Sequence, residues 1–241
     1  MIIENEYNIA LKAVNKASTY ILAQFNQRDF ACIEKLPNDF VTDADLTAQQ
    51  IIREILSSES SYPIIGEENL FDHQNQNIVW AIDPIDGTVN FINNIPIFAC
   101  AVSLINLKDF TSYVGVINLP FYQKTISAYN GGGAFLNENK IELKPNNHVS
   151  IAVMRNRRGS KLANSELKNI THFRNFGSAS YEFTMLAEQK INLYYDDSTC
   201  LWDFAAGKAI IKEIGGKVDV LPYDRDNLIL SKYKVKASLY H

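Results

Sequence analysis

The chain has 241 residues, of which 46% are hydrophobic, and carries a formal net charge of −4 at pH 7 with a pI near 5.6. This length supports a substantial core in one large domain or two small ones. The charge balance leaves no basic surplus for direct nucleic-acid binding, and no apolar run of about 18 residues predicts a membrane span.

The cysteines and histidines indicate a reduced protein without a sulfur- or nitrogen-bound metal. The three cysteines are odd in number and far apart. The first residues lack the basic and apolar segments of a signal peptide, so we expect a cytoplasmic location. The four histidines show no metal-ligand spacing. Any bound metal would therefore have oxygen ligands, which favours a hard cation such as Mg²⁺.

The first half of the chain predicts helices followed by an antiparallel sheet. Apolar residues recur at helical spacing over residues 5–26 and again over 45–57. HQNQN, residues 73–77, is typical of a loop, and the glycine-rich segment 129–137 predicts a turn followed by a short strand. The predicted strands before that turn are 62–65, 78–83, 97–106, 112–119 and 124–129.

The second half alternates between strand and helix patterns, which predicts a partly parallel sheet with helices packed on it. The predicted strands are 150–154, a segment near 171–176, 191–195 and 217–221, and the predicted helices are 159–167, 180–190 and 202–214. No repeat, low-complexity segment or long linker interrupts the sequence. We therefore expect one continuous domain over 1–241, with an N-terminal half to about 145 and a C-terminal half over 146–241.

WAIDPIDGTVNF, residues 80–91, places two carboxylates at the end of an apolar strand. Asp83 and Asp86 lie three residues apart around Pro84, and like charges at such range repel each other while desolvation adds to the cost. The segment could be a turn in which a short acidic side chain bonds the backbone, which Pro84 and Gly87 also fit. The alternative is a cation or phosphate site at the buried end of the strand.

Three other acidic positions allow the same two interpretations. The glutamates of GEEN, 66–69, could form a solvated turn, and Asp203 could cap the helix that follows it. Thr42 and Asp45 have the spacing of a capping box. All of these acids stand where predicted elements begin or end, beside apolar sequence. A shared cation would explain them together.

WAIDPIDGTVNF and WDFAAGKAIIKEIGG, residues 202–216, resemble the two signature sequences of the inositol monophosphatase family. GEE and VTDAD, residues 41–45, occur in the family's order at similar spacing, and the resemblance covers nearly the whole chain, which is short after the last predicted strand. The resemblance implies an α/β (α+β type) fold, the layered α-β-α-β-α sandwich shared with fructose-1,6-bisphosphatases. It also implies a homodimeric, lithium-sensitive phosphatase that uses two to three Mg²⁺ ions.

The resemblance assigns roles residue by residue. The implied metal ligands are Glu67, Asp83, the carbonyl of Ile85, Asp86 and Asp203. The implied catalytic group, which orients and deprotonates the attacking water, is Thr88 bonded to Asp45, with help from Glu67. The backbone N–H groups of Gly87 and Thr88 would bind the phosphate. The implied substrate contacts are Asp86, Ala179 and Asp196.

The substrate stays open at this point. The most favoured is myo-inositol 1-phosphate, although Asp196 is shorter than the glutamate found there in inositol phosphatases. Histidinol phosphate, fructose 1,6-bisphosphate and a nucleotide phosphate are alternatives. The basic cluster RNRRGSK, residues 155–161, could be a solvated loop, or Arg155, Arg157 or Arg158 could contact a second phosphate. A protein of another class, which retains the fold and acts by binding a regulatory complex, is a further alternative.

Overall fold

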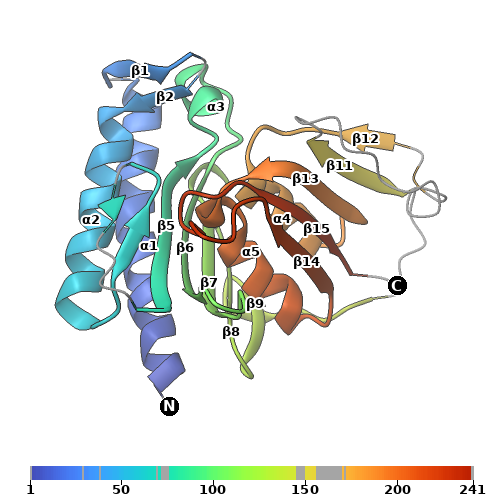
Figure 1. Cartoon of the computed structure of the whole chain (residues 1–241). Helices are drawn as coiled ribbons and strands as arrows, with labels where there is room; N and C mark the ends of the chain where they lie inside the picture. Colours follow the sequence, from blue (N-terminus) through green and yellow to red (C-terminus); the bar gives the residue numbers. More distant parts are fainter. Residues whose placement is uncertain are drawn as a thin grey trace.

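The computed structural model describes residues 2–28, 30–37, 39–68, 70–71, 76–144, 150–155, 170 and 172–239. From left to right in Figure 1, a helix pair, an eight-stranded sheet, a second helix pair and a five-stranded sheet form successive layers. The predicted α/β sandwich is thereby confirmed, with the described residues forming four of the five expected layers. The helix predicted over 159–167, the loop residues 73–75, and Arg157 and Arg158 lie outside the described residues.

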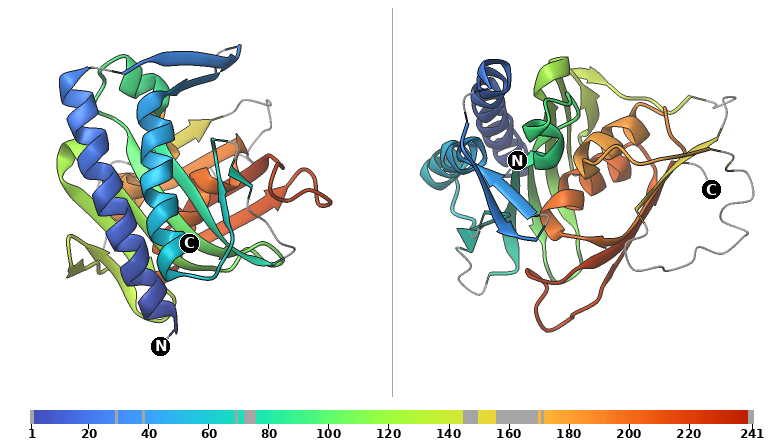
Figure 2. Two further views of the ribbon diagram at one scale, coloured as in Figure 1. Left: turned by 90° about the vertical axis from the view of Figure 1, so that its left-hand side faces the viewer. Right: turned by 90° about the horizontal axis from the view of Figure 1, so that it is seen from above.

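The N-terminal helices cover one face of the first sheet, as the left view of Figure 2 shows. They are α1 (Ile2–Gln27) and α2 (Asp43–Glu59), which confirm the two predicted helices. The helix α2 begins after Thr42, whose hydroxyl accepts a hydrogen bond from the Asp45 backbone while the Asp45 carboxylate accepts one from the Thr42 backbone. The predicted capping box is therefore present. A hairpin of β1 (Cys32–Leu36) and β2 (Asp39–Thr42), which the sequence analysis did not predict, joins the two helices.

The first sheet has the strand order β10-β9-β8-β7-β6-β5-β3-β4, and its only parallel pair is β3 with β5 in the described part of the chain. Its strands are β3 (Ile64–Gly66), β4 (Leu70–Phe71), β5 (Ile78–Asp86), β6 (Ala99–Asn106), β7 (Ser112–Leu119), β8 (Lys124–Tyr129), β9 (Gly133–Leu136) and β10 (Asn139–Lys140). The short helix α3 (Thr88–Ile92) follows β5, and the 3₁₀ turn η1 (Pro120–Tyr122) joins β7 to β8.

Side chains alternate between two cores on the two faces of this sheet. On β6, Cys100 and Val102 belong to the core under α1 and α2, whereas Ala99 and Ala101 belong to the core shared with the C-terminal half. Successive residues of a strand point to opposite faces, so a strand buried on both faces is apolar throughout. This explains the continuous apolar sequences of β5 and β6.

The C-terminal half packs α4 (Ala179–Ala187) and α5 (Leu201–Glu213) between the two sheets, as the view from above in Figure 2 shows. The second sheet has the order β12-β11-β13-β15-β14. Its strands are β11 (Ile151–Arg155), β12 (His172–Arg174), β13 (Leu193–Thr199), β14 (Lys217–Pro222) and β15 (Tyr233–Ser238). The strand β11 pairs in parallel with β12 and β13, whereas β15 pairs antiparallel with its neighbours, so the predicted partly parallel sheet is confirmed.

The strand β15 corrects the expectation that β14 is the last strand. It lies between β13 and β14 and alternates buried and half-buried residues along its length. The last strand of the described chain is therefore an interior strand of the second sheet.

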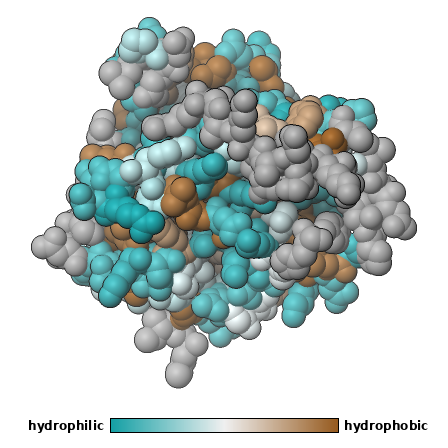
Figure 3. Space-filling view, turned by 45° about the vertical axis from the view of Figure 1, so that its right-hand side comes forward, coloured by the Kyte–Doolittle hydropathy of each residue, from teal (hydrophilic) through white to brown (hydrophobic). Residues whose placement is uncertain are grey.

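The outer surface is mixed in character. On the face shown in Figure 3, hydrophobic residues form several separate small areas among hydrophilic ones. No helix in the described residues has the length and apolarity needed to cross a membrane.

The approach of α5 to β7 leaves no room for a side chain at Gly115, which gives a test of the packing. A Cβ atom there would lie 2.4 Å from the carbonyl oxygen of Ala206 and 2.8 Å from the Cβ of Ala209. We expect Gly115→Ala to lower the free energy of unfolding by about 1–3 kcal/mol because the helix must shift. Ser112→Ala on the same strand is the matched control, with an expected change within about 0.5 kcal/mol. Equal urea midpoints for wild type and Gly115→Ala would contradict this packing.

Candidate active site

A bulge in β5 brings Asp83 and Asp86 to one face of the first sheet. Residues three apart in a regular strand point to opposite faces. Here Asp83 pairs with Ala101 and Asp86 with Ala99, so one extra residue on β5 restores the alternation. Both pairing alanines belong to the core shared with the C-terminal half. The two carboxylates therefore face α4 and α5, and the strand continues through Asp86 instead of ending at Asp83 as predicted.

Glu67 joins these aspartates because β3 runs parallel to β5. Gly66 pairs with Ile82, and the Glu67 backbone N–H donates to the Ile82 carbonyl at 3.3 Å. The carboxyl groups of Glu67 and Asp83 lie within hydrogen-bonding reach of each other. Two carboxyl groups come this close either when one of them is protonated and donates a hydrogen bond to the other, or when a cation lies between them.

The N-termini of α4 and α5 complete the acidic cluster. Asp203 is the third residue of α5, and its Oδ2 accepts hydrogen bonds from the Thr199 hydroxyl at 2.8 Å and the Cys200 backbone at 2.9 Å. This is the capping role considered from the sequence. The Oδ2 atom of Asp86 accepts a hydrogen bond from the backbone N–H of Ser180 at the start of α4. Acids at these positions also interact favourably with the helix dipoles.

The turn after β5 requires a glycine. Gly87 has a φ of 97°, and a Cβ atom there would lie 2.9 Å from the Ile97 carbonyl oxygen. Asn90 holds the following helix in place, since its Nδ2 donates to the carbonyls of Ile97 and Phe176, each at 2.8 Å. The backbone N–H groups of Gly87 and Thr88 therefore occupy a turn whose conformation both halves of the molecule fix.

These elements surround a cleft of about 560 Å³. Seven of the predicted site residues line it, namely Glu67, Asp83, Ile85, Asp86, Gly87, Thr88 and Asp203. Asp45 is fully buried beside the cleft and accepts a hydrogen bond from the Thr88 hydroxyl at 3.3 Å. That hydroxyl lies 3.0 Å from the Ile85 carbonyl, a second possible acceptor.

Burial and mutual repulsion raise the pKa values of the acids in the cluster. For Asp83 and Glu67 the pKa lies well above the ordinary range, chiefly because burial disfavours the charged form and then because neighbouring carboxylates repel it. The pKa of Asp86 rises for the same reasons, and the charge of Arg155 partly opposes that rise. Burial raises the pKa of Asp45 to about 6, although hydrogen bonds from Thr42 act in the opposite direction.

The donor set fits a hard cation. All the side-chain donors are oxygens, and Asp83 Oδ1 is buried without a hydrogen-bond partner in the described part of the chain. Yet no three Asp, Glu, His or Cys side chains among the described residues are grouped tightly enough to hold an ion directly. The carboxylates repel one another without a cation, so binding would require small side-chain rotations toward a common point.

Two of the predicted substrate contacts do not line the cleft. Ala179 and Asp196 are 0% and 1% exposed, and Asp196 accepts a hydrogen bond from the Ser198 backbone at 2.8 Å. Arg155, the pairing partner of Asp196 in the adjacent strand, lines the cleft instead, as does Gly177. Arg155 is only 6% exposed, so it does not belong to a solvated loop.

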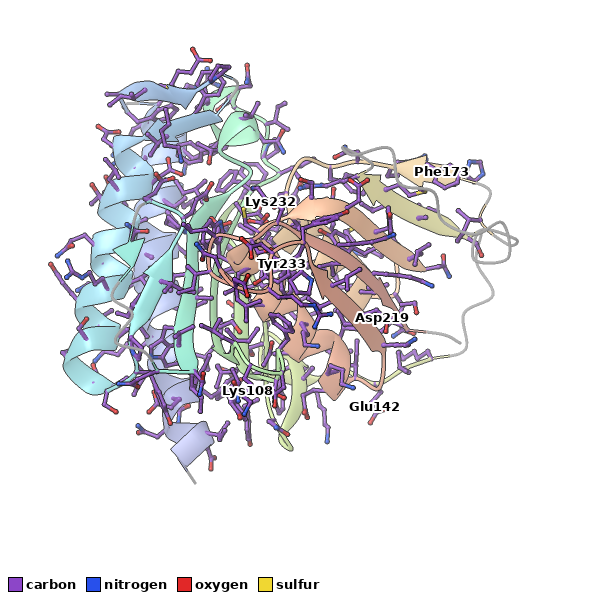
Figure 4. All side chains as sticks on the ribbon, viewed as in Figure 1. Lys108, Glu142, Phe173, Asp219, Lys232 and Tyr233 are labelled. Carbon is purple, nitrogen blue, oxygen red and sulfur yellow. The ribbon has the colours of Figure 1, made fainter. Side chains whose placement is uncertain are left out.

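The sequence analysis missed two cations in the cleft wall, Lys35 and Lys232. Lys35 comes from β1 and forms an ion pair with Glu68 at 2.9 Å. Lys232 precedes β15 and donates to the sulfur of Cys200 at 2.7 Å. Figure 4 shows Lys232 at the junction between the first sheet and the second. The turn sequence PND at 37–39 and the alternation in YKVKAS, 233–238, were the available signals for these strands.

Comparisons with known proteins agree with this arrangement. The model of the "Inositol monophosphatase family" matches residues 3–238. The Nus factor SuhB of Vibrio cholerae is 31% identical over 255 residues, which cover 97% of this chain and 94% of that protein. The inositol-1-monophosphatase of Rhizobium meliloti is 31% identical over 227 residues, covering 87% and 83%. The crystal structure of the extragenic suppressor protein suhB from Bartonella henselae superposes with a TM-score of 0.80 at 25% identity, covering 97% and 93%.

The raised pKa values predict that the protein without metal loses stability as the pH rises. Asp45, with a pKa of about 6, stays protonated in the folded chain where unfolded carboxyls, with pKa values near 4, already ionise. Stability should therefore fall between about pH 4 and 6, by on the order of 3 kcal/mol from Asp45. Thermal melting in EDTA across this range measures the loss, and added Mg²⁺ should reverse part of it.

The variant Asp83→Asn isolates the contribution of the cluster. Because it removes one buried ionisable group, its loss of stability with rising pH should be smaller than that of the wild type. Asp109→Asn, at an exposed turn, is the matched control and should keep the wild-type slope. Stability that increases from pH 5 to 8 in EDTA would contradict the assignment of a repulsive cluster.

Proposed function

Because the chain belongs to the inositol monophosphatase family, we propose that it is a metal-dependent phosphatase of small phosphate monoesters. The observation that carries this proposal is the buried acidic cluster, in which Asp83 Oδ1 has no partner among the described residues, beside Thr88 on the wall of the same cleft. A structural cluster would gain nothing from leaving a carboxylate oxygen unpaired in the interior.

Glu67, Asp83, Asp86, Asp203 and the Ile85 carbonyl would hold two to three Mg²⁺ ions. Bound divalent cations neutralise the charge of a phosphate dianion and acidify water, which is the chemistry that hydrolysis of a phosphate monoester needs.

Thr88 and Asp45 would orient the attacking water. When the Thr88 hydroxyl donates to Asp45, its oxygen lone pairs remain available to accept a hydrogen bond from a water in the cleft. Asp45 is held by the hydroxyl and the backbone N–H of Thr42, the latter at 2.8 Å, so its carboxylate keeps its position beside Thr88. Glu67, which lines the same cleft, would assist in accepting the proton of the water.

The turn at Gly87 and Thr88 would hold the phosphate. Both residues line the cleft beside the acidic cluster, and successive backbone N–H groups in a turn of this kind can bind an anion. Water is the nucleophile in this scheme, so no phosphoenzyme forms.

The proposed substrate is myo-inositol 1-phosphate, and histidinol phosphate, fructose 1,6-bisphosphate and a nucleotide phosphate remain alternatives for the same chemistry. Relatives named inositol-1-monophosphatase, such as that of Bacillus subtilis at 29% identity, support the first choice. Inhibition by lithium, a cytoplasmic location and a homodimer belong to the same proposal.

A regulatory role is the second candidate. Several similar proteins carry the name Nus factor SuhB, including that of Haemophilus influenzae at 30% identity over 244 residues. Asp83→Asn separates the two functions, because it should abolish turnover and leave any binding of a regulatory complex intact.

The phosphatase proposal predicts Mg²⁺-dependent release of phosphate from at least one of the four substrates. Asp83→Asn should abolish the release because it removes the negative charge of one of the proposed cation ligands. Thr88→Ala should lower kcat by about 10²-fold or more because the water loses its orienting hydroxyl. Malachite-green assays with and without Mg²⁺ provide the measurement.

Asp109→Asn and Thr19→Ala are matched controls on the exposed surface, and each should retain wild-type turnover. Folded wild-type protein that releases no phosphate from any of the four substrates would overturn the proposal and leave the regulatory role.

A further inference from the structure

Arg155 is a buried cation at the wall of the cleft that the proposed mechanism does not use. It ends β11, is 6% exposed, and lines the same cleft as the acidic cluster. Its Nε lies 3.0 Å from Glu182 Oε2 on α4, and its Nη1 lies 3.9 Å from Asp196 Oδ2 on β13. The guanidinium group is therefore held from two sides by elements of the C-terminal half.

Two donor atoms of the guanidinium group are buried without a hydrogen bond to any of the described residues. They are Nε, which nevertheless lies 3.0 Å from Glu182 Oε2, and Nη2. A buried N–H donor of a charged group is costly to leave unpaired. Because Arg155 lines the cleft, a rotation of its side chain would bring Nη2 within reach of a group bound there.

The surrounding charges decide which kind of group that is. Glu182 and Asp196 already offset the single positive charge of Arg155, and Asp86 acts on it as well. A second phosphate at Nη2 would bring two more negative charges toward three acidic side chains. An uncharged hydroxyl oxygen accepts the same hydrogen bond without that repulsion.

We propose that Arg155 is a specificity-determining residue that donates a hydrogen bond from Nη2 to an uncharged hydroxyl oxygen on the alcohol portion of the substrate. This deepens the proposed function and rests on it. A hydrogen bond of this kind favours polyhydroxylated monophosphates over bisphosphates as substrates. It also means that a donor, Arg155, recognises the hydroxyl, whereas the sequence analysis expected an acidic acceptor, Asp196.

Three phosphates built on one ring test this assignment. They are myo-inositol 1-phosphate, cyclohexyl phosphate, which lacks the hydroxyls, and myo-inositol 1,4-bisphosphate, which adds a second phosphate. Wild-type protein should have its highest kcat/KM for the first. Arg155→Lys retains a charge beside Glu182 but loses the planar fork of donors. It should lower kcat/KM for myo-inositol 1-phosphate about tenfold or more, and that for cyclohexyl phosphate less than about threefold.

Two further variants separate recognition from folding. Arg155→Gln combined with Glu182→Gln removes both charges of the closer ion pair together, and it should show the same selective loss. Lys124→Gln breaks another ion pair with the end of α4, that of Lys124 with Glu188 at 2.6 Å, and should leave the three kcat/KM values unchanged. Thermal melting verifies that each variant is folded.

An equal loss for all three phosphates in Arg155→Lys would show a structural role and overturn the assignment. A loss confined to the bisphosphate would show recognition of a second phosphate and also overturn it. If wild-type protein hydrolyses none of the three, the proposed function fails. The affinity for myo-inositol 1-phosphate, measured by calorimetry, then tests whether Arg155 recognises a hydroxyl. Weaker binding by Arg155→Lys than by wild type would support the assignment, whereas equal or absent binding would overturn it.

Discussion

The repulsion between buried carboxylates at the ends of β3 and β5 is the constraint on which the arrangement of this protein depends. Glu67, Asp83 and Asp86 lie on or beside neighbouring strands, and Asp203 reaches them from the N-terminus of α5. Desolvation and like charge both oppose their ionisation. A folded chain can retain such a cluster only when surrounding packing is strong enough to hold it, so the site and the two cores have to be understood together.

The two cores provide that support because the first sheet is buried on both faces. One core joins it to α1 and α2, and the other joins it to α4, α5 and the second sheet. The bulge after Asp83 then directs both aspartates toward the second core, where the backbone N–H of Ser180 meets Asp86. Residues from both halves of the chain therefore form the cleft, and neither half contains the whole acidic cluster.

Local signals in the sequence predicted most of this fold, and long-range pairing accounts for what they missed. Helical periodicity gave α1 and α2, and the spacing of Thr42 and Asp45 gave the capping box. The hairpin of β1 and β2 and the strand β15 are short and rich in charged residues, so apolar content alone did not reveal them. The acidic motifs gave the candidates that line the cleft. Arg155 received no single role because its burial depends on Glu182, which lies 27 positions away in sequence and on another element.

Compensation of buried charge distinguishes the two sides of the cleft. On the side of the first sheet, the described acids lack enough cations from the chain itself, so their repulsion is relieved either by protonation or by a cation from outside. On the side of the second sheet, Glu182 and Asp196 already offset the charge of Arg155, so an added negative charge would be repelled by the two acids. The first side is therefore suited to binding metal and phosphate, and the second to recognising uncharged polar groups. A phosphate monoester of a neutral alcohol has a charged phosphate at one end and uncharged hydroxyls at the other. These two parts correspond to the two sides of the cleft, which connects its electrostatics with the proposed class of substrate.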